Sequence, residues 1–282
     1  MSLEINSKIK NVDADTIKSF GDEWARFNQS DLPAAEAERI FNEYFLVFPW
    51  DRIAKDSTGF DMGCGSGRWA KLMAPRVGHL HCIDPSSALD VAKLALASVA
   101  NVTFHSALVD DNPLPANSQD FGYSLGVLHH VPDTARAIQS CVAMLKSGAP
   151  FQLYLYYAFD NRSWLFKLTW RCSDMLRRVI CKLPSMLKHL VTDILAMVLY
   201  YPLARLSLLA ENIGLNVSSI PLSYYRNHSF YTMRTDSRDR FGTPLEQRFT
   251  REEIAAMMDA AGLRDVQFSD HAPYWCAVGI KQ

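Results

Sequence analysis

The chain of 282 residues has almost no net charge and no clustered cysteines. Its 29 basic and 30 acidic residues leave a formal net charge of −1, which argues against a dedicated nucleic-acid-binding protein because such proteins carry an excess of basic residues. The six cysteines are scattered without a C-x-x-C pair, so neither a disulfide framework nor a zinc ribbon is expected. The pattern predicts buried thiols in a reducing cytoplasm, and no spacing of metal ligands is evident.

Long apolar runs are also missing. No uninterrupted run of 18 apolar residues occurs, so the sequence predicts no membrane-spanning helix. The first residues lack the apolar core of a signal peptide, and we expect a cytoplasmic protein. Apolar residues make up 49% and charged residues 21% of the chain, which is ordinary for a globular protein long enough for one large domain, with or without an insertion.

A glycine-rich turn is the most informative feature that the chain does contain. Gly63, Gly65 and Gly67 follow an apolar run, and Asp84 ends a second apolar run 17 residues later. Glycines at a strand-to-helix turn let the backbone approach a ligand, and an acid about 20 residues on suits a ribose diol. The layout predicts a nucleoside site. Arg68 stands where the last glycine of G-x-G-x-x-G would be, which disfavours an NAD-dependent oxidoreductase, and no Gly-Lys-Ser/Thr phosphate loop is present.

Strands and helices alternate after this turn. We expect strands near 57–62, 79–84, 101–105, 119–125 and 149–157, and helices near 67–74, 86–98 and 133–146. Thr250 and Glu253 form a capping box for a later helix, which precedes two last strands near 264–269 and 274–280. Such alternation predicts a parallel sheet with helices on both faces.

Three other segments lie outside this pattern. Residues 1–54 are aromatic-rich and helical in pattern, with Asp31 as an expected helix N-cap and Trp24 on a lid over the site. Residues 161–201 have apolar positions at helical spacing, and Pro184 and Pro202 divide them. Residues 223–243 are polar, aromatic and arginine-rich, which suits either an acceptor-binding cluster or a solvated loop.

The glycine turn and the motifs after it resemble one enzyme family. D-x-G-x-G-x-G at 61–67 resembles the first motif of class I S-adenosylmethionine-dependent methyltransferases, and 113–121, 124–133 and 144–150 match later motifs of the small-molecule branch in order and spacing. That branch includes the ubiquinone/menaquinone and sugar methyltransferases. The resemblance covers roughly 55–157, with a weaker echo at 244–282.

The resemblance implies an α/β architecture. It implies a Rossmann-like, doubly wound, seven-stranded and mostly parallel sheet with an antiparallel last strand. The expected division is an N-terminal helical cap at 1–54, a methyltransferase core at 55–157 and 244–282, and a mainly helical insertion at 158–243 that serves as a lid or binds the acceptor.

The resemblance also implies that the cofactor is S-adenosyl-L-methionine and which residues bind it. Carried over onto this sequence, the cofactor-binding residues are Asp61, Gly63, Cys64, Gly65, Gly67, Asp84, Pro85, Ser86, Asp110, Leu125 and Gly126, with Asp111 as the alternative to Asp110 for the adenine amino group.

Two histidines follow the fourth expected strand, beside the expected methyl position. His129 and His130 are candidate catalytic bases because histidine titrates near neutrality; the alternative is that they orient the loop. The candidate substrate-binding residues share a mixture of tyrosine, arginine and histidine that suits an anionic or hydroxylated acceptor. They are Tyr157, Tyr225, Arg226, His228, Tyr231 and Arg234.

The sequence thus predicts methyl transfer to a small-molecule acceptor, first to oxygen of a sugar or other metabolic intermediate. The alternatives are carbon methylation of a quinone-like or lipid-linked acceptor, and a non-catalytic nucleoside-binding module. Residues 162–201 mix basic and apolar side chains. They predict either peripheral contact with a membrane or lipid-linked substrate, or a helical lid packed against the core or across a homodimer interface.

Overall fold

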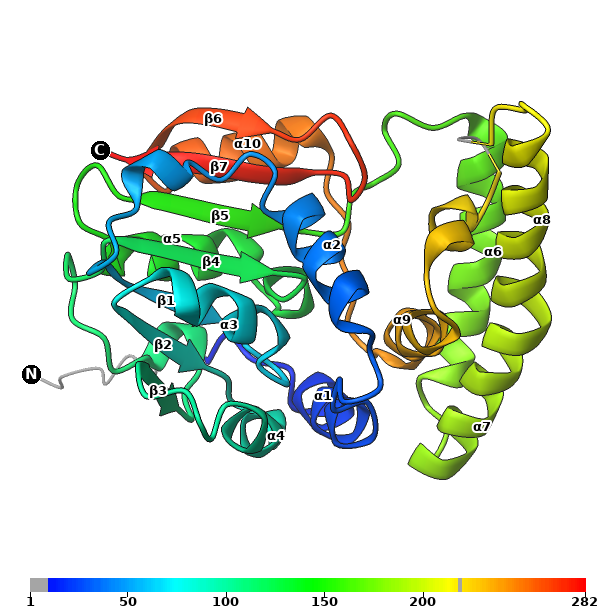
Figure 1. Ribbon diagram of the computed structural model, residues 1–282, viewed down its shortest axis with the longest axis horizontal. Coiled ribbons are helices and arrows are strands. Elements are labelled where there is room, and N and C mark those ends of the chain that lie inside the picture. Colours follow the sequence, from blue (N-terminus) through cyan, green and yellow to red (C-terminus); the bar gives the residue numbers. More distant parts are fainter. Residues whose placement is uncertain (1–9, 218–219) are drawn as a thin grey trace, which may run out of the picture.

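The computed structural model describes residues 10–217 and 220–282, which form a seven-stranded sheet in the order β3-β2-β1-β4-β5-β7-β6 (Figure 1). The strands are β1 (Thr58–Met62), β2 (His79–Ile83), β3 (Val102–His105), β4 (Phe121–Leu125), β5 (Pro150–Tyr154), β6 (Leu263–Phe268) and β7 (Cys276–Lys281). β1 to β5 pair in parallel, and β7 is antiparallel to both β5 and β6. The predicted Rossmann-like α/β fold is confirmed.

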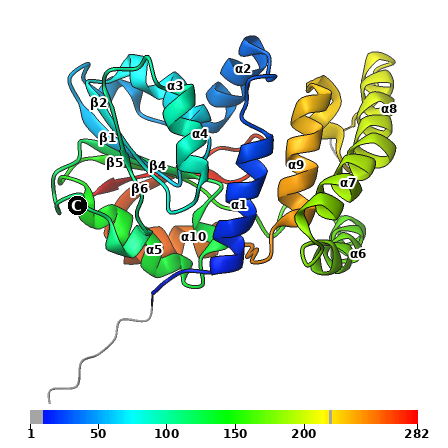
Figure 2. The same cartoon turned by 90° about the horizontal axis from the view of Figure 1, so that it is seen from below.

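Helices cover both faces of this sheet (Figure 2). One face packs on α3 (Arg68–Met73), α4 (Ala88–Ala95) and α2 (Ala34–Tyr44), and the other on α5 (Thr134–Met144) and α10 (Arg251–Ala260). Every residue of β4 is buried, as expected for a central parallel strand covered on both sides.

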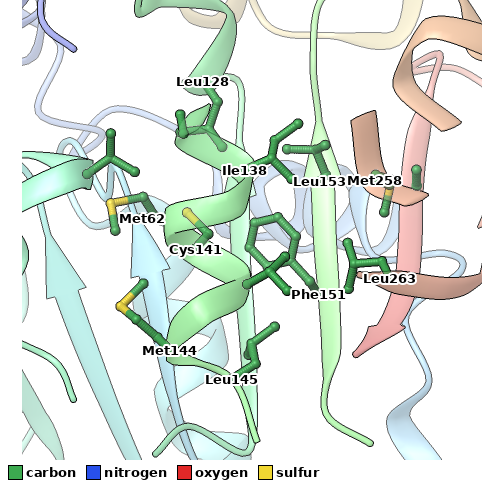
Figure 3. Packing of buried hydrophobic residues seen from close by; sticks show 14 of the residues in the cluster. Met62, Leu128, Ile138, Cys141, Met144, Leu145, Phe151, Leu153, Met258 and Leu263 are labelled. Atoms are coloured by element: carbon green, nitrogen blue, oxygen red, sulfur yellow. The ribbon is translucent and has the colours of Figure 1, made fainter. Parts of the chain in front are cut away.

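The α5 face shows how apolar spacing makes the core (Figure 3). Ile138 and Cys141 of α5 and Leu145, the residue after the helix, lie around Phe151 of β5 and are fully buried. Met258 of α10 completes the cluster. The capping box predicted at Thr250 is present, because its side chain accepts from the Glu253 amide while the Glu253 carboxylate accepts from the Thr250 amide.

The N-terminal segment forms α1 (Ala14–Arg26) and α2, followed by a short 3-10 turn, η1 (Trp50–Arg52). α1 lies along α4 and α9 at the carboxyl edge of the parallel strands (Figures 1 and 2). Asp13 caps α1 through the Thr16 amide. The expected cap at Asp31 is wrong: α2 begins at Ala34, its N-cap is Pro33, and no side chain caps the helix.

Between β5 and α10 the chain forms an outer layer of helices. α6 (Trp164–Ile180), α7 (Ser185–Leu195) and α8 (Tyr201–Asn212) lie outside α9 (Phe230–Gly242), which separates them from the sheet domain (Figures 1 and 2). The part of 223–243 that sequence left open as a solvated loop is a 3-10 turn, η6 (Ser223–Asn227), and a well-buried helix. Arg238 of α9 is fully buried because it meets Asp22, Glu23 and Ser19 of α1.

Pro202 does not divide the outer helices as predicted. α7, the π-helical turn η5 (Ala196–Tyr200) and α8 make one helix, Ser185–Asn212. The wider turn just before Pro202 accommodates the missing backbone donor, so the helix continues. Its mean hydropathy of 1.4 over an 18-residue window makes it long and apolar enough to cross a membrane by length and composition alone. The search for an uninterrupted run of 18 apolar residues missed this helix, and that nothing spans a membrane stays a prediction.

Candidate functional site

A cavity of about 590 Å³ lies at the carboxyl ends of β1, β2, β4 and β5. In the sheet, β1 lies between β2 and β4. The helices that follow β1 and β4, α3 and α5, cover opposite faces of the sheet (Figure 2). Ligands of open α/β sheets bind at this switch in strand order. α1 closes one side of the cavity, and α6, η6 and α9 close the other.

The glycine loop after β1 forms the floor of the cavity. Gly63 has a φ of +78°, and a Cβ atom there would lie 2.4 Å from the Val127 side chain. Gly65 has a φ of +53°, and a Cβ atom there would lie 3.0 Å from the indole nitrogen of Trp24. Both positions therefore require glycine. Trp24 of α1 lies over the loop, where the sequence predicts a lid.

Asp84 directly follows β2 and is held by hydrogen bonds from Gly65 and Ser86. Its Oδ2 accepts from the Gly65 amide at 2.9 Å, and its Oδ1 accepts from the Ser86 amide at 2.8 Å and the Ser86 hydroxyl at 2.6 Å. The carboxylate is nearly buried but lines the cavity with Pro85 and Ser86. Burial raises the pKa of Asp84, and the bonds from Ser86 and Gly65 oppose that rise.

Four of the predicted cofactor residues do not line the cavity. Asp61 lies behind the loop, where burial raises its pKa to about 8, and Gly67 caps α3. Asp110 forms an ion pair with Arg136 at 2.6 Å, and neither it nor Asp111 reaches the cavity. Leu108 and Val109 line this end instead, which suits the flat apolar faces of an adenine ring.

The cofactor cradle is the part of the cavity formed by the glycine loop and Asp84. Its end opposite Leu108 and Val109 contains Leu125, Gly126 and Arg68. The Gly126 amide donates to the Tyr154 carbonyl at 3.0 Å, which fixes the end of β4. The Arg68 guanidinium lies 4.3 Å from the ring centre of Trp69 and 5.4 Å from that of Trp24. Sequence reasoning used Arg68 only as a departure from a glycine pattern; its place directly after the loop could have marked it as a cavity residue.

His130 lines the cavity with one nitrogen free. Its Nδ1 lies 2.6 Å from the Leu245 carbonyl oxygen. Since a carbonyl only accepts, Nδ1 carries the proton and Nε2 is left as an acceptor. Nε2 is buried and has no hydrogen-bond partner among the described residues. Burial lowers the pKa of His130, although Asp239 and the Leu245 carbonyl oppose this. The ring is therefore neutral near pH 7 and can accept a proton.

His129 has a different position. It is fully buried and does not line the cavity. Its ring centre lies 4.0 Å from that of Tyr156 and 3.9 Å from that of His130. Burial lowers the pKa of His129 well below its usual range. Of the two predicted histidines, His130 is brought to the cavity and His129 packs behind it.

The acceptor side of the cavity contains a group of charged residues, of which only Asp239 and Arg240 belong to the arginine-rich segment 223–243 that the sequence offered as an acceptor-binding cluster. The Tyr156 hydroxyl donates to the Asp239 carboxylate. Arg240 and Arg248 both pair with Glu246, at 3.1 and 2.8 Å. All of these except Glu246 line the cavity. They come from β5, α9 and the segment before α10, so only the folded chain places them together.

Asp236 is a second, half-buried acid of α9 on this side. It lines the cavity one helical turn before Asp239 on α9. Burial raises the pKa of Asp236 to about 6. Aromatic and apolar side chains fill the rest of the wall, among them Phe166 and Trp170 of α6 and Leu203 of α8.

The predicted substrate residues separate into two groups. Tyr157 and Tyr225 line the cavity. The other four do not line it and bond to other parts of the chain instead. Arg226 pairs with Glu211 at 2.8 Å, Arg234 pairs with Asp193 at 3.0 Å, the Tyr231 hydroxyl accepts from the Gln29 amide at 2.9 Å, and the His228 Nδ1 donates to the Tyr224 carbonyl at 3.0 Å.

Comparison with known proteins gives this geometry a family. The methyltransferase domain family matches residues 60–152. The ubiquinone biosynthesis O-methyltransferase of Serratia proteamaculans is 30% identical over 169 residues, which cover 58% of this chain and 68% of that protein. That of Marinobacter nauticus is 39% identical over 108 residues, 36% of this chain and 44% of that protein. The chain thus spans about half to two thirds of the length of these curated relatives.

The fold comparison agrees. The YcgJ protein of Bacillus subtilis superposes with a TM-score of 0.50 at 17% identity, covering 80% of this chain and 70% of that one. The glycine loop, the acid at the end of β2 and the seven-stranded sheet with its antiparallel last strand lie where this fold requires them. With these matches and this geometry, the chain belongs to the class I S-adenosylmethionine-dependent methyltransferases.

Proposed function

We propose that the protein transfers a methyl group from S-adenosyl-L-methionine to an oxygen atom of a small-molecule acceptor. The observation that supports oxygen is the unpartnered Nε2 of His130 in the cavity wall. A hydroxyl is a weak nucleophile and gains from a base that removes its proton, and a neutral histidine near its operating pH is such a base.

The cradle fits the cofactor. Gly63 and Gly65 leave room that any Cβ atom would fill, and Asp84 presents a buried carboxylate that still has acceptor capacity. When bound, S-adenosylmethionine supplies an electrophilic methyl group. The residues of the chain then have three tasks: Asp84 orients the ribose, Trp24 covers the glycine loop and excludes water, and His130 takes the proton that the acceptor hydroxyl loses.

The acceptor wall supports a polar and aromatic acceptor. Arg240 and Arg248 both pair with Glu246, and the carboxyl groups of Asp236 and Asp239 line the same wall, so it carries charged groups of both signs. Phe166 and Trp170 provide flat apolar surface. A hydroxylated aromatic or glycosidic compound would use both the charged groups and the flat apolar surface. The net charge of −1 supports a small molecule rather than nucleic acid as the partner.

Two other functions make different predictions. Carbon methylation of a quinone-like ring would use the same base and is favoured by the aromatic wall. A non-catalytic nucleoside-binding module would not need His130 Nε2 free in the cavity. The ubiquinone biosynthesis relatives act, by name, on oxygen, which supports the oxygen proposal for this chain.

The test is acceptor-dependent release of S-adenosylhomocysteine. The protein would be incubated with the methyl donor and a panel of catechols, hydroxybenzoates and sugar derivatives, and the product analysed by NMR. An O-methyl product supports the proposal. A C-methyl product moves the function to the alternative. Tight binding of the methyl donor without turnover of any acceptor favours the binding module, and binding of NAD instead of the methyl donor contradicts the whole proposal.

A further inference from the structure

The outer layer exposes an unusual amount of apolar surface. Of the 21 large apolar side chains that are exposed in the described chain, 18 lie between residues 164 and 215. Met186 is 85% exposed, Trp164 75% and Met175 68%. Monomeric soluble proteins rarely expose a contiguous apolar patch of this kind, and larger patches mark interaction sites. We call the exposed side of α6 and the Ser185–Asn212 helix the outer face.

These helices carry their polar side inward and their apolar side outward. Asp174 and Arg177 of α6 and Lys188 and Thr192 of α7 are buried. Arg177 donates to the Thr243 and Pro244 carbonyls at 3.0 and 2.9 Å. On the other side, apolar residues recur at three- and four-residue intervals. On a surface helix of a soluble protein the apolar side faces the core and the polar side faces water. Here the two sides are reversed, so the outer face is suited to an apolar phase.

Charge distinguishes between a second copy of this chain and a membrane. The acids of the outer helices are already paired: Asp174 with Arg177 and Arg178, Asp193 with Arg26 and Arg234, and Glu211 with Arg226. Lys167, Arg171 and Lys182 form no ion pair within the described chain and lie on α6 or just after it. A symmetric dimer through this face would bring the same uncompensated cations together. Anionic lipid head groups would neutralise them.

The contacts of the Ser185–Asn212 helix show how it would lie. The Ser237 hydroxyl of α9 donates to the Thr192 carbonyl at 2.8 Å, and Arg234 of α9 pairs with Asp193. A helix fixed to α9 along one side by buried polar groups cannot be surrounded by lipid, so it lies in the plane of the interface rather than across it.

We propose that the outer face docks the protein on an anionic phospholipid bilayer, with α6 and the Ser185–Asn212 helix parallel to the membrane. Leu199 lines the cavity and is also 40% exposed. The cavity therefore opens beside the docking surface, and the acceptor wall of the site lies next to the lipid.

Co-sedimentation of the full chain with sucrose-loaded vesicles tests this proposal. The protein should pellet with vesicles of phosphatidylcholine containing phosphatidylglycerol, bind several-fold less to phosphatidylcholine alone, and lose binding as salt is added. The double variant Leu190→Asp/Met197→Asp should bind at least tenfold less. Its control is Leu94→Asp, because Leu94 is 81% exposed on α4, on the sheet domain.

A second pair of variants separates charge from apolar contact. Arg171→Glu/Lys182→Glu should lose the preference for anionic vesicles, whereas Arg52→Glu/Lys71→Glu, also exposed but outside the outer layer, should keep it. Circular dichroism and titration with S-adenosylmethionine would show that each variant is folded, so the result does not depend on methyl-transfer activity.

Three outcomes would overturn the proposal. In the first, the wild-type protein remains in the supernatant with anionic vesicles. In the second, Leu190→Asp/Met197→Asp binds the vesicles as well as Leu94→Asp does. In the third, sedimentation equilibrium shows a dimer that Leu190→Asp/Met197→Asp dissociates. The last result would assign the outer face to a second copy of the chain.

Discussion

Replacing Asp84 with asparagine tests the cofactor site at the residue on which its geometry depends. Each carboxylate oxygen can accept about two hydrogen bonds. The Asp84 Oδ1 accepts two from Ser86, and Oδ2 accepts one from Gly65. One acceptor position on Oδ2 is left, and the Ser86 hydroxyl can rotate away to free a second. These two positions match the two hydroxyls of a ribose.

Asp84→Asn is nearly isosteric but supplies one oxygen and one NH₂ group. Whichever way the amide lies, its NH₂ opposes either the Gly65 amide or the Ser86 amide, both of which donate in the wild-type protein. A hydrogen bond to a charged group contributes about 1.5–3 kcal/mol. Loss of one such bond to the ribose should therefore weaken cofactor binding by about 10- to 150-fold. The free energy of unfolding should fall by less than the free energy of cofactor binding. Burial raises the pKa of Asp84, and the neutral amide avoids the cost of a buried charge.

Isothermal titration with S-adenosylmethionine and S-adenosylhomocysteine measures the affinity, and urea unfolding measures the stability. Asp120→Asn is the matched control. Asp120 accepts from the Thr58 amide at 2.8 Å and pairs with Lys146 at 2.7 Å, but it lies outside the cavity, so this variant should lose stability and keep its affinity. If Asp84→Asn binds both ligands within threefold of the wild type, or if the two variants weaken binding equally, Asp84 does not hold the ribose.

The remaining predictions concern the base, the acid sensitivity and one helix cap. His130→Asn keeps a donor for the Leu245 carbonyl but removes Nε2, so kcat should fall by about 10²–10⁴ with cofactor affinity unchanged; an unaltered kcat would remove His130 as the base. Because burial lowers the pKa of His130, wild-type activity should persist below pH 6.5 and fall only as the pH passes through that lower pKa. Burial lowers the pKa of His228 to about 4, so between about pH 6.5 and 4 the unfolded chain binds a proton that the folded protein does not bind. The free energy of unfolding should therefore fall as the pH falls through this window, by about 3 kcal/mol at most. His228→Asn should reduce the slope of unfolding free energy against pH by about one proton. Thr250→Ala breaks the capping box of α10 and should cost about 1 kcal/mol in urea unfolding without changing cofactor binding.

The sheet was largely predictable from the sequence, because its strands are short apolar runs between turns and glycine. β1 to β4 lie within two residues of their predicted bounds, and the last two strands were placed equally well. β5 is the exception. It ends at Tyr154, and Tyr157, which was expected in the strand, forms an isolated bridge with Phe249. The tyrosines there continue the alternating pattern of a strand, but after Tyr154 the chain leaves its neighbours β4 and β7.

The cofactor cradle was predictable for a related reason. Gly63, Gly65 and Asp84 are close in sequence and follow strands, so the parallel pairing of β1 and β2 brings them together. The acceptor wall was predictable only in part: His130 was named from the sequence and lines the cavity, whereas Asp239 and Arg248 were not named and come from distant segments. Arg226 and Arg234 have the composition expected of an acceptor site, but ion pairs with Glu211 and Asp193 turn them away from the cavity. Residue type alone does not distinguish these two outcomes.

The outer helices show a limit of periodicity that matters for function. Apolar residues at helical spacing along α6, such as Leu168 and Met175, indicate one apolar face but do not say whether that face turns inward. In the structure they turn outward, because α9 offers polar partners on the inner side. Ser173 of α6 accepts from Arg240 of the acceptor wall at 3.0 Å. α6 thus carries the outer face on one side and bonds an acceptor-site arginine on the other. A surface on which α6 docks would therefore be separated from the acceptor wall by this one helix.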